Sequence, residues 1–182
     1  MNWLGKIIQK EITKDDTVLD LGCGIMQATT NSLQQKPKKR ELFIKDQKEI
    51  ECKSLLGCDI VDKYLDVAKK HFPVIHLGMD ELNRFMDLSF DVVICIDVLE
   101  HLLKVQAYNT INEMKRIARK KIIVYTPSKE ITNEEHVEDA WGLGYNELQL
   151  HKSFISSEEL QSLGFKTSFP EPDKNTLGIF YV

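Results

Sequence analysis

The chain has few of the residues that build disulfide-bonded, membrane-spanning or secreted proteins. Its 182 residues include four cysteines and five prolines, and the cysteines are too scattered to form a C-x-x-C pair. No apolar run approaches the roughly 20 residues of a membrane span. The first residues also lack the basic and apolar regions of a signal peptide. We therefore expect a cytoplasmic protein whose Cys58 and Cys95, which lie in strand-like runs, are buried free thiols.

An excess of positive charge is also absent. The net charge is −4 and the sequence pI is about 5.8, which argues against a broad nucleic-acid-binding face, although a local one stays compatible with it. A basic run, KPKKR, stands at residues 36–40, and we interpret it as solvated surface. With 29 % charged and 42 % apolar residues, the composition is that of a soluble globular protein.

Strand-like and helix-like patterns alternate from residue 17 to residue 127. Five apolar runs predict strands, and the segments 61–72 and 99–120 show helical spacing: the runs are TVLDLG, SLLGCDI, VIHLGM, FDVVICIDVL and KKIIVYTP. The alternation predicts a single α/β domain over residues 1–182 with a mainly parallel sheet. Residues 128–155, which show no clear period, are expected to form a lid or acceptor segment.

Several polar residues and glycines follow directly after the predicted strands. In an open α/β sheet, ligands bind outside the carboxyl ends of the strands. The residues found there are Asp20, Gly22, Gly24, Asp59, Met79, Asp80, Asp97, Glu100, His101 and Thr126. The two glycines allow a sharp turn and a close approach of backbone to a ligand. A carboxylate at the second strand end suits the hydroxyls of a ribose.

Two common nucleotide-binding sites are disfavoured at this turn. A P-loop requires a G-K-[ST] sequence after the glycines, and none follows. The dinucleotide fingerprint G-x-G-x-x-G requires a third glycine where Gln27 stands, and Asp59 lies too far along the chain to be its ribose acid. An NAD-dependent oxidoreductase is therefore a poor fit.

The motifs VLDLGCG, LLGCDI, GMDEL and FDVVICIDVLEHL occur in this order at the predicted strand ends. Together they resemble the class I S-adenosylmethionine-dependent methyltransferases, specifically the small type-11-like members. The resemblance implies a Rossmann-like, seven-stranded, mainly parallel sheet with a C-terminal antiparallel hairpin and helices on both faces. It also implies S-adenosyl-L-methionine as cofactor. The chain departs from the family at Met26, where a third glycine is common, and in the length of the 36–53 insertion.

The resemblance carries over a set of cofactor-binding residues: Asp20, Gly22, Gly24, Asp59, Ile60, Met79, Asp80 and Ile96. In this set Asp59 would hold the ribose hydroxyls, and Ile60 and Asp80 would contact the adenine. Asp97 would border the methionine moiety through its backbone.

Methyl transfer from a sulfonium depends mainly on positioning, and a hydroxyl or amine acceptor also needs a base. We predict Asp97, His101 and His151 as catalytic residues. On a helix, Asp97, Glu100 and His101 would share one face. His136, Trp141 and Tyr145 are further candidates in the acceptor segment.

The acceptor is open at this stage. Without a separate recognition domain, we expect transfer to an oxygen or nitrogen of a small molecule or a glycan or lipid precursor, without a metal. As an alternative, Asp97-x-x-Glu100-His101 with His151 resembles the metal-binding pattern of small-RNA 2′-O-methyltransferases. A second alternative is a non-catalytic cofactor-binding scaffold. The oligomeric state is not indicated.

Overall fold

The computed structural model describes residues 7–8, 10–25, 52–70, 72–133, 143–144, 146–171 and 174–182. Several predictions concern residues outside these ranges, namely those for Met26, His136, Trp141, Tyr145 and most of the 36–53 insertion.

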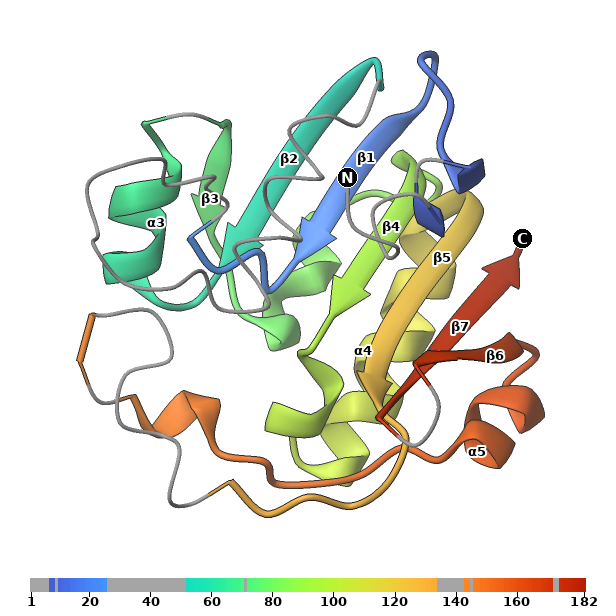
Figure 1. Ribbon diagram of the computed structural model, residues 1–182. Coiled ribbons are helices and arrows are strands. Elements are labelled where there is room, and N and C mark those ends of the chain that lie inside the picture. Colours follow the sequence, from blue (N-terminus) through green and yellow to red (C-terminus); the bar gives the residue numbers. More distant parts are fainter. Residues whose placement is uncertain are drawn as a thin grey trace.

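A seven-stranded sheet forms the centre of the molecule (Figure 1). Its strands are β1 (Thr17–Leu21), β2 (Ser54–Asp59), β3 (Val74–His76), β4 (Phe90–Ile96), β5 (Ala118–Pro127), β6 (Lys166–Glu171) and β7 (Asn175–Tyr181). The spatial order is β3-β2-β1-β4-β5-β7-β6. Strands β1 to β5 pair in parallel, whereas β7 runs antiparallel to both β5 and β6. The predicted Rossmann-like sheet and its C-terminal antiparallel hairpin are confirmed.

Within the described ranges, three α-helices and three 3-10 helices lie between these strands. They are α3 (Asp62–Ala68), α4 (Lys104–Ile117), α5 (Ser157–Ser162), η1 (Met79–Arg84), η2 (Leu99–His101) and η4 (Glu147–Gln149). Helix α5 begins with a capping box, because the Ser156 hydroxyl accepts from Glu159 N (3.2 Å) and the Glu159 carboxylate accepts from Ser156 N (2.8 Å). Among the described helices, none combines the length and apolarity that crossing a membrane requires.

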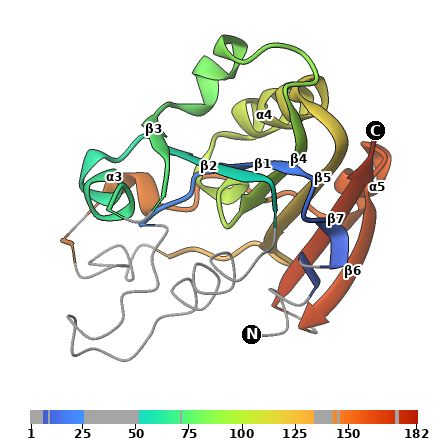
Figure 2. The ribbon, with the colours of Figure 1, turned by 90° about the horizontal axis from the view of Figure 1, so that it is seen from above.

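The inner strands are buried on both faces, since alternate side chains of a strand point to opposite sides of the sheet. In β1, Val18 packs in one apolar cluster and Leu19 in the other. Helices α4 and α5 and the η1 turn cover the Leu19 face, and Figure 2 shows α4 standing on that side of the sheet. Helix α3 and the N-terminal segment around Ile8 cover the opposite face. Helices on both faces, as predicted, therefore enclose the strands.

The prediction of one helix over residues 99–120 was wrong at both ends. Leu102 and Leu103 have extended backbone between η2 and α4, so the helical segment is interrupted. At the other end, Ala118 already belongs to β5 and pairs with Phe90. Arg119 and Lys120 are therefore strand residues, because the sheet pairing overrides the helical spacing.

These two cations meet a buried carboxylate at the amino edge of the sheet. The Asp91 carboxylate accepts hydrogen bonds from Thr17 N (2.9 Å) and Thr17 Oγ1 (3.0 Å) and from Arg119 (2.7 Å), and Lys120 Nζ lies 3.2 Å away. Burial favours the neutral acid, but the hydrogen bonds from Thr17, Arg119 and Lys120 outweigh it. The pKa of Asp91 is therefore held below its ordinary value.

Replacement of this carboxylate tests its contribution to folding. We expect Asp91→Asn to lower the free energy of unfolding at pH 7 by about 1–3 kcal/mol, the range for hydrogen bonds to a charged group. Because the folded-state pKa is lowered, the contribution is present above the unfolded pKa of about 3.9 and is lost as the pH falls through the folded pKa. Urea unfolding measures this free energy. The difference between wild type and variant should be constant from about pH 7 to pH 5 and should shrink below about pH 4.

The matched control is Asp87→Asn, because Asp87 also accepts from an arginine but its side chain is 74 % exposed. It should change the free energy of unfolding much less. If Asp91→Asn lowers the free energy of unfolding no more than Asp87→Asn does, the proposed stabilising role of the Asp91 carboxylate is contradicted.

Candidate functional site

The turn after β1 lies at the point where the strand order reverses. Strand β1 pairs with β2 on one side and with β4 on the other, and ligands of open α/β sheets bind at such a switch point. Gly22 and Gly24 have φ angles of 67° and 57°, which are in the left-handed region that favours glycine. The chain therefore makes a compact turn at the carboxyl edge of the sheet.

Gly22 also has no room for a side chain. A Cβ atom there would lie 2.4 Å from Cγ2 of Val98, a buried residue that follows β4. Both the backbone angle and the packing thus require glycine, and the turn passes directly against the end of β4.

The Asp59 carboxylate fixes the same turn from the other side. It accepts from Gly24 N (2.8 Å) through Oδ2 and from Val61 N (3.0 Å) through Oδ1. The residue is 8 % exposed and still lines the adjoining cleft. The two backbone bonds therefore fix the orientation of this carboxylate at the edge of the cleft.

A cleft of about 360 Å³ opens beside this turn. Its lining residues come from the ends of β1 to β4, from α4 and from residues 148–152. They are Gly22, Asp59, Ile60, Val61, Leu77, Gly78, Met79, Asp80, Asp97, Val98, His101, Leu102, Gln106, Asn109, Thr110, Leu148, Gln149 and Lys152. Within the predicted cofactor set, the structure brings together Gly22, Asp59, Ile60, Met79 and Asp80.

The remaining predicted cofactor residues lie just outside the lining. Asp20 is 2 % exposed and Ile96 is 1 % exposed, both within strands. Gly24 contributes its backbone N–H to Asp59.

A second glycine keeps two cleft residues close together. A Cβ atom on Gly78 would lie 2.6 Å from Oδ1 of Asp80 and 3.4 Å from Cδ1 of Ile60. Ile60 is 49 % exposed, so an apolar side chain from the end of β2 and a carboxylate from η1 flank the same space.

The prediction that Asp97, Glu100 and His101 share one helical face was wrong. Asp97 precedes η2 and has a φ of 50°, in the left-handed region that aspartate tolerates better than most residues. Its N–H donates to Tyr125 O (2.8 Å) and continues the pairing of β4 with β5. Consequently Asp97 and His101 line the cleft, whereas Glu100 is 3 % exposed beneath it.

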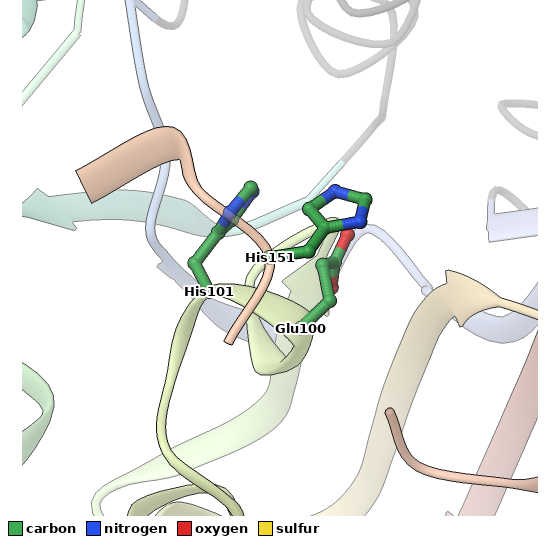
Figure 3. A group of neighbouring side chains, drawn as sticks. All are labelled: Glu100, His101 and His151. Atoms are coloured by element: carbon green, nitrogen blue, oxygen red, sulfur yellow. The ribbon is translucent and has the colours of Figure 1, made fainter. Parts of the chain in front are cut away.

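Glu100 instead forms a group with two histidines, shown in Figure 3. One possible ligand atom from each of Glu100, His101 and His151 lies within 4.8 Å of the other two, and the two imidazole centroids are 5.1 Å apart. Thr126 Oγ1 donates to the Glu100 carboxylate (3.2 Å). His151 is therefore brought beside His101 although it does not line the cleft itself.

Each histidine of the group is oriented by a backbone carbonyl. His101 Nδ1 is 3.2 Å from Leu150 O, and His151 Nδ1 is 2.8 Å from Ile131 O. A carbonyl only accepts hydrogen bonds, so Nδ1 is the donor in both rings and Nε2 carries the lone pair of each neutral imidazole. The arrangement suits a proton acceptor or a metal ligand at Nε2.

Sequence reasoning missed the cleft residues contributed by α4 and by the segment after residue 146, among them Gln106, Asn109, Leu148 and Lys152. Their types are ordinary for a solvated helix or loop. Gln106 and Asn109 reach the cleft because α4 packs against η1. Leu148 and Lys152 reach it from a distant part of the chain. No spacing in the sequence encodes either approach.

Comparison with known proteins decides the family. A family model described as a methyltransferase domain matches residues 19–125, more than half of the chain. The chain belongs to this methyltransferase family. The match includes the turn after β1, the end of β2 and the segment from β4 to β5. It confirms the predicted class of enzyme and, with it, S-adenosyl-L-methionine as the methyl donor.

Solved structures share the fold of this methyltransferase at low sequence identity. The PH0226 protein from Pyrococcus horikoshii OT3 has a TM-score of 0.65 and 18 % identity, over 98 % of this chain and 86 % of its own. Magnesium protoporphyrin IX methyltransferase from Synechocystis PCC 6803, solved with bound S-adenosylhomocysteine, has a TM-score of 0.62 and 15 % identity, over 98 % and 80 %. The methyltransferase domain of bacterial CtHen1-CN has a TM-score of 0.57 and 16 % identity, over 98 % and 95 %. Among curated proteins, none matches the chain.

Proposed function

We propose that the chain transfers a methyl group from S-adenosyl-L-methionine to an oxygen or nitrogen atom of a small molecule or of a glycan or lipid precursor. The observation that carries this proposal is the convergence of Gly22, Asp59 and Asp80 on one cleft at the switch point of the sheet. One domain over residues 1–182 would hold both substrates, with residues 128–155 as the lid or acceptor segment. A cytoplasmic location stays a prediction.

The residues present fit an adenosine group. Gly22 presents backbone without a side chain in the cleft wall, and the oriented Asp59 carboxylate would accept from the two ribose hydroxyls. The exposed Ile60 side chain offers an apolar surface for a purine ring, while Asp80 at the same end of the cleft would accept from its amino group. The cofactor would supply an activated sulfonium methyl group.

The chain's own contribution to the reaction would be positioning and proton removal. His101 lines the cleft, and its Nδ1–H is engaged with Leu150 O, so its Nε2 lone pair is the proton acceptor in this ring. We propose His101 as general base toward an acceptor hydroxyl or amine, since histidine is the side chain whose ordinary pKa lies nearest to neutral. His151 and Asp97 would border the acceptor.

The ribose role of Asp59 has a direct test. We expect Asp59→Ala to weaken S-adenosylhomocysteine binding by about 1–3 kcal/mol, because hydrogen bonds to a charged group are lost. Isothermal titration calorimetry measures this change. Asp62→Ala is the control, since Asp62 lies in the same stretch of chain with an 80 % exposed side chain that pairs with His76. Unchanged affinity in Asp59→Ala would remove the ribose assignment, and circular dichroism establishes that the variant is folded.

A metal-assisted reaction is the second candidate, and the Glu100–His101–His151 group favours it. Buried carboxylates are ordinarily paired or bound to metals, and Glu100 lies beside two imidazoles whose Nδ1 atoms are held by carbonyls. In metal sites a ligating histidine typically donates its other N–H to a carbonyl or carboxylate in this way. A carboxylate with two imidazoles suits Mn²⁺. The acceptor would then be a hydroxyl, such as the ribose 2′-hydroxyl of an RNA. Asp97 is not part of this group.

Metal binding distinguishes the two candidates. If the metal-assisted candidate holds, electron paramagnetic resonance should detect Mn²⁺ bound to the purified protein, and His151→Ala should abolish that binding by removing one ligand. His76→Ala is the control, because His76 lies on the surface beside Asp62. Failure of the wild-type protein to bind Mn²⁺ would remove the metal-assisted reaction and leave His101 as the base.

A further inference from the structure

One segment crosses the carboxyl edge of the sheet from the side of α3 to the side of η2. We call residues 143–144 and 146–153 the strap; it follows the lower edge of the sheet in Figure 1, in orange. Near its middle, Leu148 and Gln149 line the cleft. The strap therefore forms one wall of the proposed cofactor site.

Helix α3 holds the first end of the strap through two adjacent side chains. Lys63 Nζ donates to Leu143 O (2.9 Å) and to Gly144 O (3.2 Å). The hydroxyl of Tyr64 accepts from Asn146 Nδ2 (3.1 Å). Tyr64 is 2 % exposed, so the position of its hydroxyl is fixed by core packing.

Asn146 connects this attachment to the cleft wall. Its Oδ1 accepts from Leu148 N (3.1 Å) and so caps the η4 turn. One amide side chain thus receives its orientation from Tyr64 and begins the turn that carries Leu148 and Gln149. Movement of Asn146 would move the wall.

The far end of the strap is attached to η2 by its backbone. Lys152 N and Ser153 N both donate to Glu100 O, at 2.7 and 3.2 Å. Asn133 Nδ2 also donates to Gln149 O (2.7 Å). The two backbone bonds to Glu100 O do not depend on side-chain identity, whereas the attachment to α3 depends on the identities of Lys63 and Tyr64.

We propose that Lys63 and Tyr64 are positioning residues that hold Leu148 and Gln149 over the bound nucleoside and slow its release. The inference rests on the proposed function, because it places the cofactor in this cleft. Helix α3 begins three residues after Asp59, whose carboxylate accepts from Val61 N. The proposed ribose-binding carboxylate and the strap attachments therefore belong to one short, continuous piece of chain.

The dissociation rate of S-adenosylhomocysteine, measured by surface plasmon resonance, tests the proposal. The loss of one or two hydrogen bonds predicts roughly three- to tenfold faster dissociation in Lys63→Met and in Tyr64→Phe. Lys63→Arg retains the charged donor and should restore a rate close to wild type. Lys69→Met is the control on the same stretch of chain, because Lys69 is exposed and pairs with Asp66.

A double-mutant cycle separates positioning from general loosening of the fold. Leu148→Ala alone should speed dissociation, and adding Lys63→Met should then have little further effect, because both changes act through the same wall. Wild-type dissociation rates in both Lys63→Met and Tyr64→Phe would overturn the proposal. Absence of S-adenosylhomocysteine binding by the wild-type protein would instead overturn the proposed function and, with it, the inference.

Discussion

Two hydrogen bonds to the Asp59 carboxylate hold together the parts of the molecule that make its cleft. One comes from Gly24 and fixes the turn after β1, and the other comes from Val61 and fixes the start of α3. Because β1 and β2 are parallel neighbours, their ends meet at one edge, and one short side chain bridges them. Through Lys63 on α3, the same link extends to the strap. The shape of the cleft therefore depends on this carboxylate.

The two edges of the sheet use carboxylates differently. At the amino edge, Asp16 and Asp91 share Lys120, and their charges are balanced within the fold. At the carboxyl edge, Asp59 and Asp80 face a cleft. Parallel topology produces this division, because every strand of β1 to β5 presents its carboxyl end on the same side. The Asp16 and Asp91 ion pairs lie at the opposite edge from the cleft, so changes to them can alter folding without touching the site.

The sequence predicted the sheet and the residues at its strand ends better than it predicted the local backbone geometry of the site. Alternating patterns and four ordered motifs were enough for the sheet, the hairpin and the placement of Asp59 and Asp80. The prediction that Asp97 and Glu100 share a helical face was wrong, because Asp97 has a left-handed backbone conformation and a 3-10 turn follows it in place of an α-helix. The attachment of Lys63 to Leu143 joins residues 80 positions apart, and no periodicity reports such a contact.

Calorimetric titration of the wild-type protein with S-adenosylhomocysteine, with NAD as the comparison ligand, tests the central claim most directly. We expect saturable binding of one S-adenosylhomocysteine per chain and no heat of binding with NAD. The reason is that the proposed adenosine site lies beside a turn that lacks the dinucleotide fingerprint. Binding of NAD in preference to S-adenosylhomocysteine, or no binding of S-adenosylhomocysteine to the folded protein, would contradict it.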